Sequence, residues 1–316
     1  MRISRSAGLT ARLYGNALVL AAFVAVIAPL SAQRGPQAPP LVKEGATEKI
    51  ADHVYVIPDG SISMVPNITI VVGSRSTFVV DTGLGARNAE TVLREVAKVS
   101  KNADLGLATT HFHPEHDLGA HAFPPNTKMY RSRDQQVDID ESGGEIAKRF
   151  AGFSPLNAEL LQGATFRKAD VFFDKEQTVD LGGVRVRMIA MGMNHTRGDT
   201  AFWIEPDGIL VSGDVVMSTV PNVGAGSKLS TWIQSLDRLE QLKPRRVVPS
   251  HGPMFDAATI TNWKTFLTTV RTRAAALKKE GKSLDDTVKS IQDELGDKYD
   301  RNRMAGAIRA AYNEAP

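Results

Sequence analysis

Four of the seven histidines of the chain fall within residues 111–121, in the segment "HFHPEHDLGAH". A short apolar run at residues 105–110 comes directly before them, so the segment is expected to follow a buried strand, where functional loops often lie. In an extended backbone alternate side chains point to the same side, which would bring His111, His113 and Glu115 together. Imidazole and carboxylate groups that converge in this way are typical of a metal site. The segment therefore requires a fold in which a strand ends where ligands from elsewhere in the chain can meet it.

The first 32 residues have the pattern of a secretory signal peptide, because three arginines precede an apolar run at residues 17–30 and cleavage is expected after Ala32. The apolar run is shorter than the roughly 20 residues that a membrane span needs. We therefore expect a periplasmic or secreted protein with no membrane span after cleavage, and an uncleaved anchor is the alternative. Residues 33–48 are rich in proline and glycine and are expected to form a flexible leader.

The charge and the cysteine content of the chain limit the kinds of partner and of metal ligand that can be expected. Loss of the signal peptide balances the charge, because 38 − 3 = 35 basic residues then stand against 35 acidic residues. Nucleic acid is not an expected partner, since its binding depends on a concentrated basic face, and a small-molecule substrate is expected instead. The chain has no cysteine, so an exported form is held without disulfides and a metal site could use only histidine and carboxylate ligands.

Two successive series of predicted elements have the same order: β-strands, a helix, a strand, and a loop with candidate ligands. This order predicts an α/β fold, an αββα sandwich of two mixed β-sheets with outer helices, over residues 49–265. Residues 266–316 are expected to form a C-terminal helical extension that covers this domain or supports a homodimer. A polar, partly helical insertion near the site is expected at 132–170. The strands expected most clearly are 53–57, 68–73, 76–81, 105–110 and 245–252, and the helices are 88–101 and 228–243.

Five motifs, in this order, resemble those of the metallo-β-lactamase superfamily: "VVDTG" with Asp81, "HFHPEHDLG", "NHTRGDT" with His195, "LVSGDVV" with Asp214, and "VVPSHGP" with His251. The resemblance covers about residues 50–255. It implies a site for two metal ions, with these ligands: His111, His113 and His195 for the first ion, Glu115, His116 and His251 for the second, and Asp214 as a bridge between them. Glu115 and Asp214 are the candidate catalytic carboxylates.

Zinc suits this set of ligands, with two ions per chain expected and iron or manganese as alternatives. Bound zinc makes hydroxide available at neutral pH, so the expected reaction is attack of a metal-bound hydroxide on a carbonyl. Glu115 stands where the family usually has aspartate, so either the backbone compensates for the extra methylene or the second site is weakened. Asp81, Thr110 and Asp199 lie beside ligand segments and are expected to hold the ligands by hydrogen bonds, although Asp81 also suits a simple turn at a strand end.

The expected activity is that of a secreted metal-dependent hydrolase that opens a cyclic amide or ester, a β-lactam or a lactone. The absence of cysteine excludes the β-lactamase classes that use a cysteine ligand, and a bridging Asp214 is more typical of the glyoxalase II and lactonase branches. Two alternatives stay open. One is a glyoxalase II-like thioesterase or an iron-dependent sulfur dioxygenase, and the other is an accessory maturation factor with a metal site.

Overall fold

The computed structural model describes residues 38–224 and 226–316. The expected signal peptide, residues 1–32, lies outside these ranges, as do the leader residues up to 37. In the described part of the leader, Val42 is buried and its N–H donates to Asn88 Oδ1 at 2.7 Å. No helix within the described ranges is both long enough and apolar enough to cross a membrane.

The first sheet has seven strands, antiparallel from β1 to β4 and parallel from β4 to β7. The carboxyl ends of parallel strands meet at one edge, where sites in α/β folds usually lie. The ligand segment follows β5 at this edge, and Asp81 follows β4. In spatial order the strands are β1 (Glu48–Lys49), β2 (Val54–Ile57), β3 (Ile68–Val72), β4 (Thr77–Val80), β5 (Leu105–Ala108), β6 (Lys128–Ser132) and β7 (Val171–Phe173).

The second sheet has five strands, in which only β11 and β12 are parallel. Its connections carry the remaining candidate ligands: His195 lies between β9 and β10, Asp214 directly follows β11, and His251 comes two residues after β12. In spatial order the strands are β12 (Arg246–Pro249), β11 (Ile209–Gly213), β10 (Asp199–Ile204), β9 (Arg185–Gly192) and β8 (Glu176–Asp180).

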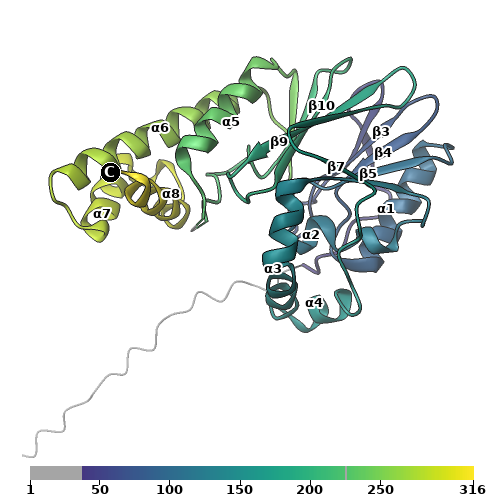
Figure 1. Ribbon diagram of the computed structural model, residues 1–316, viewed down its shortest axis with the longest axis horizontal. Coiled ribbons are helices and arrows are strands. Elements are labelled where there is room, and N and C mark those ends of the chain that lie inside the picture. The colour runs from purple at the N-terminus through teal and green to yellow at the C-terminus, as the bar shows by residue number, and fades with distance from the viewer. Residues whose placement is uncertain (1–37, 225) are drawn as a thin grey trace, which may run out of the picture. The chain divides into compact units, whose positions relative to one another are not determined.

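Three apolar layers hold the sheets and helices together, and the two sheets with outer helices are visible in Figure 1. Val54, Phe78 and Phe202 belong to the layer between the two sheets. The outer face of the first sheet packs on α1 (Gly85–Val99), and that of the second packs on α5 (Leu229–Gln241) and α6 (Ala258–Lys279). This order of layers confirms the predicted αββα sandwich of two mixed sheets.

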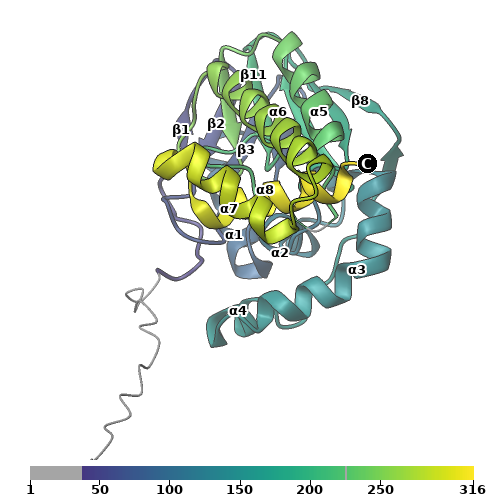
Figure 2. The same ribbon diagram turned by 90° about the vertical axis from the view of Figure 1, so that its left-hand side faces the viewer.

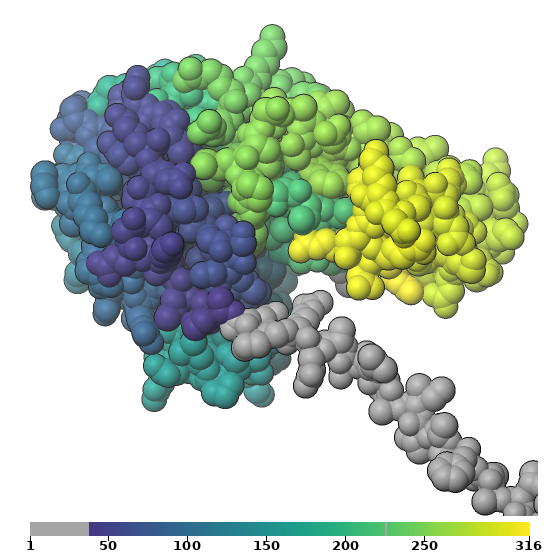
Figure 3. Space-filling model, turned by 180° about the vertical axis from the view of Figure 1, so that it is seen from behind, coloured from purple at the N-terminus to yellow at the C-terminus, as the bar shows by residue number. Residues whose placement is uncertain are grey.

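The C-terminal region is helical, as predicted, and α5 and α6 lie side by side (Figure 2). Because α6 begins at Ala258, the expected boundary at 265/266 falls inside this helix. Two further helices complete the region, α7 (Leu284–Leu295) and α8 (Arg301–Glu314), and α8 packs against α5, α6 and α7. From behind, the C-terminal residues, in yellow, lie against the green residues of the helices before them (Figure 3).

The polar segment after β6 forms two helices, α3 (Arg133–Ala151) and α4 (Pro155–Leu160). Each begins at a serine whose hydroxyl accepts a backbone N–H three residues on, Ser132 for α3 and Ser154 for α4. Such N-caps satisfy one of the free N–H groups at a helix start. The caps set where the segment leaves β6, at the same edge of the sheet as the ligand segment.

Candidate metal centre

The first group of candidate ligands consists of three histidines whose ring nitrogens face one another. His111 Nε2 lies 3.0 Å from His113 Nδ1, and the same His113 Nδ1 lies 3.3 Å from His195 Nε2. Two nitrogens bound to one tetrahedral zinc ion at about 2.05 Å would lie about 3.3 Å apart. The three rings therefore fit a cation of this kind as they stand.

The second group consists of Glu115, His116 and His251, in which one ligand atom of each lies within 4.8 Å of the others. His116 Nε2 is 3.7 Å from Glu115 Oε1. His116 Nε2 and Glu115 Oε2 are both buried, and neither has a hydrogen-bond partner among the described residues. Because buried polar atoms are nearly always paired, these two atoms fit a cation that both can bind.

The backbone presents Glu115 differently from the expectation. A short helix, α2 (Pro114–Asp117), begins directly after His113 and places Glu115 beside His116. The expectation that Glu115 shares one side of the chain with His111 and His113 is therefore wrong. The two groups nevertheless contain the residues that the family resemblance implied for each ion.

Asp214 lies next to both groups. Its Oδ2 is 3.4 Å from His195 Nε2, and its Oδ1 is buried without a hydrogen-bond partner in the described part of the chain. Burial alone would raise the pKa of this carboxyl, but histidines of both groups, His195 and His251 foremost, lower its pKa to about 2. A carboxylate that stays ionised between two sets of imidazoles is suited to bridge two cations.

The electrostatics of His111 and His113, in the first group, also suit cation binding. Burial lowers the pKa of His111 and His113 well below the usual range, and the neighbouring imidazoles lower it further. Both rings are therefore neutral near pH 7, the form that binds metal. Burial also lowers the pKa of His116, but the Asp81 carboxylate beside it outweighs burial and raises the pKa to about 9. Burial raises the pKa of the Glu115 carboxyl.

Asp81 connects the two ligand groups from the end of β4. Its Oδ2 accepts from His116 Nδ1 at 2.9 Å, which leaves Nε2 of that ring for a cation. Its Oδ1 accepts the N–H of Thr110 at 2.7 Å, and the Thr110 hydroxyl lies 3.1 Å from His111 Nδ1. Asp81 has φ of 69°, a left-handed conformation that is uncommon outside glycine and is enriched at functional sites.

His195 is oriented by a group that the sequence does not reveal. Its Nδ1 donates to the backbone carbonyl of Asn222 at 2.9 Å, whereas the expected partner, Asp199, accepts the backbone N–H of His195 at 2.7 Å. Asp199 also accepts the N–H and the hydroxyl of Thr196, and burial raises the pKa of its carboxyl to about 7. Asp199 therefore holds the backbone of the ligand loop, and Asn222 holds the ring. No residue type marks a carbonyl partner, so no feature of the sequence could have identified Asn222.

A buried ion pair supports the ligand segment from behind. Asp117, directly after His116, accepts from Arg131 Nη2 through both carboxylate oxygens at 3.2 Å. Its Oδ2 also accepts from the Thr109 hydroxyl at 2.7 Å and from Gln135 Nε2 at 3.3 Å. These contacts tie α2 to β6 and to α3, so the position of the ligand helix depends on the polar segment that follows β6.

A pocket of about 780 Å³ opens over both groups, a size typical of small-molecule sites. Ligands from both groups and Asp214 contribute to its lining. Apolar side chains from α3 and its surroundings form part of the wall. One of them is Phe153, which is the large apolar side chain exposed to solvent among the described residues, at 51%. Two cationic side chains also line it, Arg149 from α3 and Arg303 from α8, so both the insertion and the C-terminal region contribute to the pocket.

The sequence profile of the metallo-beta-lactamase superfamily matches residues 64–251, more than half of the chain. The chain belongs to the metallo-beta-lactamase superfamily. This confirms the resemblance drawn from the five motifs, and the chain has the hydrolase fold of that superfamily. The matched range ends at His251 and includes every candidate ligand.

Individual relatives are more distant. A linear primary-alkylsulfatase from Pseudomonas sp. is 26% identical over 208 residues, which cover 55% of this chain and 39% of that protein. The structure of the stereoselective inverting sec-alkylsulfatase Pisa1 from Pseudomonas sp. is similar with a TM-score of 0.68 at 14% identity, over 85% of this chain and 50% of that chain. A metallo-beta-lactamase family protein from Thermus thermophilus has a TM-score of 0.59 at 21% identity, over 84% and 93% of the two chains. This chain thus spans half or less of the length of the two alkylsulfatases, and the structural likenesses show the fold alone.

Proposed function

We propose that this chain is a metal-dependent hydrolase that binds two cations, and that it cleaves the sulfate ester of an alcohol with an apolar chain. The observation that carries the proposal is the convergence of two ligand groups and Asp214 in one pocket that also contains cationic side chains. Zinc is the proposed metal, because five imidazoles and two carboxylates suit it. When bound, such cations lower the pKa of water and stabilise developing negative charge.

The pocket supports an anionic, amphiphilic substrate. Arg149 has no ion-pair partner within the described ranges, and it lies close enough to His113 to lower the pKa of that ring. Arg303 Nη1 donates to the carbonyl of Val220 at 2.9 Å and lies 3.7 Å from Met217 Sδ, and Arg303 is one of the residues that line the pocket. Arginine is well suited to bind sulfate and carboxylate oxygens. A sulfate ester would place its anionic group near these cations and its alkyl chain along the apolar wall.

The similarity to the primary-alkylsulfatase favours a sulfate ester as the first substrate to test. Hydrolysis would consume one water and release the alcohol and hydrogen sulfate. Opening of a β-lactam is the second candidate, because those substrates carry a carboxylate that the two arginines could bind. A neutral lactone would leave both guanidinium groups without an anionic partner. A lactone, which the sequence motifs also suggested, is therefore a weaker candidate than a sulfate ester or a β-lactam.

The experiment is a substrate panel with protein loaded with two equivalents of zinc. It contains alkyl sulfates of increasing chain length, β-lactams, lactones and thioesters. An iron-loaded sample with a persulfide and dioxygen is added to test the sulfur dioxygenase alternative. We expect sulfate release from alkyl sulfates that is lost in His113→Ala and after chelation. Absence of turnover of every sulfate ester by the zinc-loaded protein would contradict the proposal. If His113→Ala leaves binding of a partner protein unchanged, the accessory-factor alternative gains support.

Export to the periplasm or the medium is part of the proposal and rests on the signal-like pattern of residues 1–32. Cell fractionation with detection of the mature N-terminus would test it. Dimerisation through the C-terminal helices stays a prediction that light scattering of the purified protein can check.

A further inference from the structure

We propose that Asn67 and Asp59 are positioning residues for the second ligand group, because together they hold His251 in the orientation that can bind a cation. This inference rests on the proposed function, in which that group holds a metal ion. Neither residue belongs to a ligand motif. Both lie in the connection between β2 and β3, far from His251 in the sequence.

Asn67 binds the backbone on both sides of His251. Its side-chain Nδ2 donates to the carbonyl of Pro249 at 3.0 Å and to the carbonyl of Gly252 at 2.8 Å. Its backbone N–H donates to the carbonyl of Ser250 at 2.6 Å. Asn67 is 3% exposed, so water cannot readily replace these bonds. Three carbonyls around the ligand are therefore fixed by one residue.

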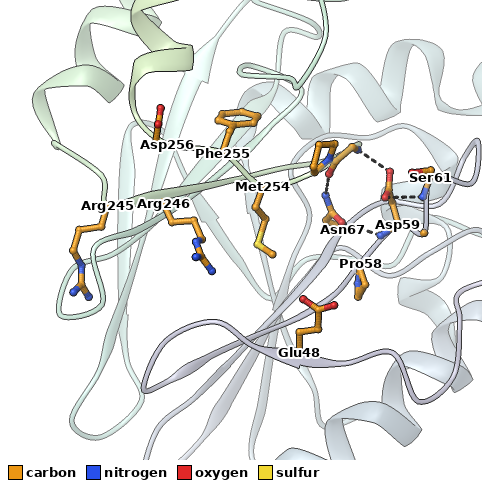
Figure 4. Close-up of a pocket in the computed structure, with 13 residues that line it drawn as sticks. Glu48, Pro58, Asp59, Ser61, Asn67, Arg245, Arg246, Met254, Phe255 and Asp256 are labelled. Carbon is orange, nitrogen blue, oxygen red and sulfur yellow. Dashed lines mark hydrogen bonds between the residues drawn. The ribbon is translucent and has the colours of Figure 1, made fainter.

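Asp59 also holds the backbone next to His251, and we call Asn67 and Asp59 together the brace. Figure 4 shows the hydrogen bonds of Asp59 to the neighbouring residues. One carboxylate oxygen accepts the N–H of Gly252 at 2.7 Å and the other accepts the N–H of Ser61 at 2.9 Å. The N–H of Asp59 donates to Asn67 Oδ1 at 2.8 Å, so the two side chains also hold each other. Gly252 has φ of +86°, and a Cβ there would come within 2.0 Å of Ser218 Oγ, so this turn has no room for a side chain.

The same connection also sets the ring of His251. Its Nδ1 donates to the carbonyl of Val65 at 3.0 Å, which leaves Nε2 as the nitrogen available to a cation. Ser61 and Met64, which both precede Val65 in this connection, have φ of 58° and 61°, conformations that non-glycine residues keep only when their surroundings enforce them. The backbone and the ring of His251 are therefore held by one rigid segment.

The brace should act on one ligand group only. Metal–ligand distances are held within about 0.2 Å, so a small shift of His251 would weaken its bond to a cation. Loss of such outer contacts typically weakens metal binding about 10- to 100-fold. His111, His113 and His195 have no hydrogen bond to Asn67 or Asp59, so binding at the first group should not change.

The chain offers a matched control for the test. Asn88 is 1% exposed, donates through Nδ2 to two carbonyls, of Pro40 at 2.9 Å and Leu84 at 2.8 Å, and accepts one backbone N–H, that of Val42. It therefore makes the same kinds of bonds as Asn67, but in the leader and α1. Asn67→Asp and Asn88→Asp each turn two donated bonds into repulsive contacts with almost no change of shape, and only the first lies beside His251.

The experiment titrates zinc alone into the full chain in competition with a chromophoric chelator, with thermal melting of the metal-free protein measured in parallel. We expect Asn67→Asp to keep one tight equivalent and to bind the second about 10- to 100-fold more weakly. Asn88→Asp should lower the melting temperature to a similar extent and bind both equivalents like the wild type. Asp59→Asn should repeat the effect of Asn67→Asp and carries the test if that variant does not fold.

Two results would overturn the inference: unchanged affinity for both equivalents in Asn67→Asp, or equal weakening in Asn88→Asp. A wild-type chain that binds fewer than two equivalents would overturn both this inference and the proposed function. A wild type that binds two equivalents and hydrolyses no ester would remove the proposed function, while the selective effect of Asn67→Asp would still support the positioning role.

Discussion

The buried ion pair behind the ligand helix gives a prediction that can be worked out in detail. Arg131 is 1% exposed and Asp117 is 0% exposed, and Arg131 also donates to the carbonyl of Arg167 at 2.8 Å. Arg131→Met keeps most of the length of the side chain but leaves the Asp117 carboxylate buried without its cation. Breaking a buried pair by removing one partner typically costs about 3–5 kcal/mol. Thr109 and Gln135 still donate to the carboxylate, so we expect a loss near the lower end, about 3 kcal/mol.

The double variant Arg131→Met with Asp117→Asn separates loss of the pair from loss of packing. Asparagine keeps an oxygen that can accept from Thr109, and no unpaired charge remains buried. Replacement of a buried pair by neutral groups is often close to neutral, so the double variant should be more stable than either single variant. The coupling between the two positions should reach about 2 kcal/mol.

Urea unfolding of the metal-free proteins, followed by circular dichroism, measures these differences without any contribution from metal. Equal slopes of the unfolding curves are needed for the comparison. If the loss of unfolding free energy in the double variant equals the sum of the losses in the two single variants, the charges are not coupled. The reasoning about this pair would then be wrong.

Three other outcomes are expected. Asp81→Asn suits the left-handed backbone but offers a poorer acceptor to the second ligand group, so chelator competition should show one of two zinc equivalents bound about 10- to 100-fold more weakly. Arg303→Met should raise KM for an alkyl sulfate about 10-fold, or about 1.4 kcal/mol, whereas Arg301→Met on the same helix, outside the pocket, should not; equal effects would argue against an anion-binding role. Burial would raise the pKa of Glu95, but hydrogen bonds to its carboxylate lower it, so its stabilisation is present at neutral pH and is lost as pH falls through that lowered pKa. The melting temperature of Glu95→Gln should accordingly fall less on acidification than that of the wild type, and an identical fall would contradict this assignment.

Much of the fold and of the ligand set could be predicted because the features that determine them are local. The alternation of apolar strands and helices indicates the two sheets, and His111, His195 and His251 each follow or join a strand of one of them. Candidate metal ligands can be recognised by their residue types. The order of the motifs along the chain, through the family resemblance, indicates which ligands share an ion. The expected strand at 105–110 ends at Ala108, since the two threonines after it already turn into the ligand loop.

The geometry around Glu115 is marked in the sequence by the proline before it. Proline at the first position of α2 is a strong mark of a helix start, and it argues against continuing the extended alternation beyond His113. The second half of the segment follows helical geometry for this reason, so Glu115 and His116 point to the second group together.

The outer contacts of the ligands could not be read from the sequence. His195 and His251 are oriented by backbone carbonyls, of Asn222 and Val65, and a carbonyl is present at every residue. Asn67 contacts its partners across 182 and 185 positions of the chain. Arg303 enters the pocket from a helix that the sequence indicated only as an appendage. These contacts depend on how distant segments pack, and no local pattern encodes that packing.

The most direct test of the central claim is anomalous diffraction at the zinc edge from crystals of the zinc-loaded chain. The account predicts two peaks about 3.5–4 Å apart, one among His111, His113 and His195 and the other among Glu115, His116 and His251, with Asp214 between them. A single peak, or peaks away from these two groups, would contradict it.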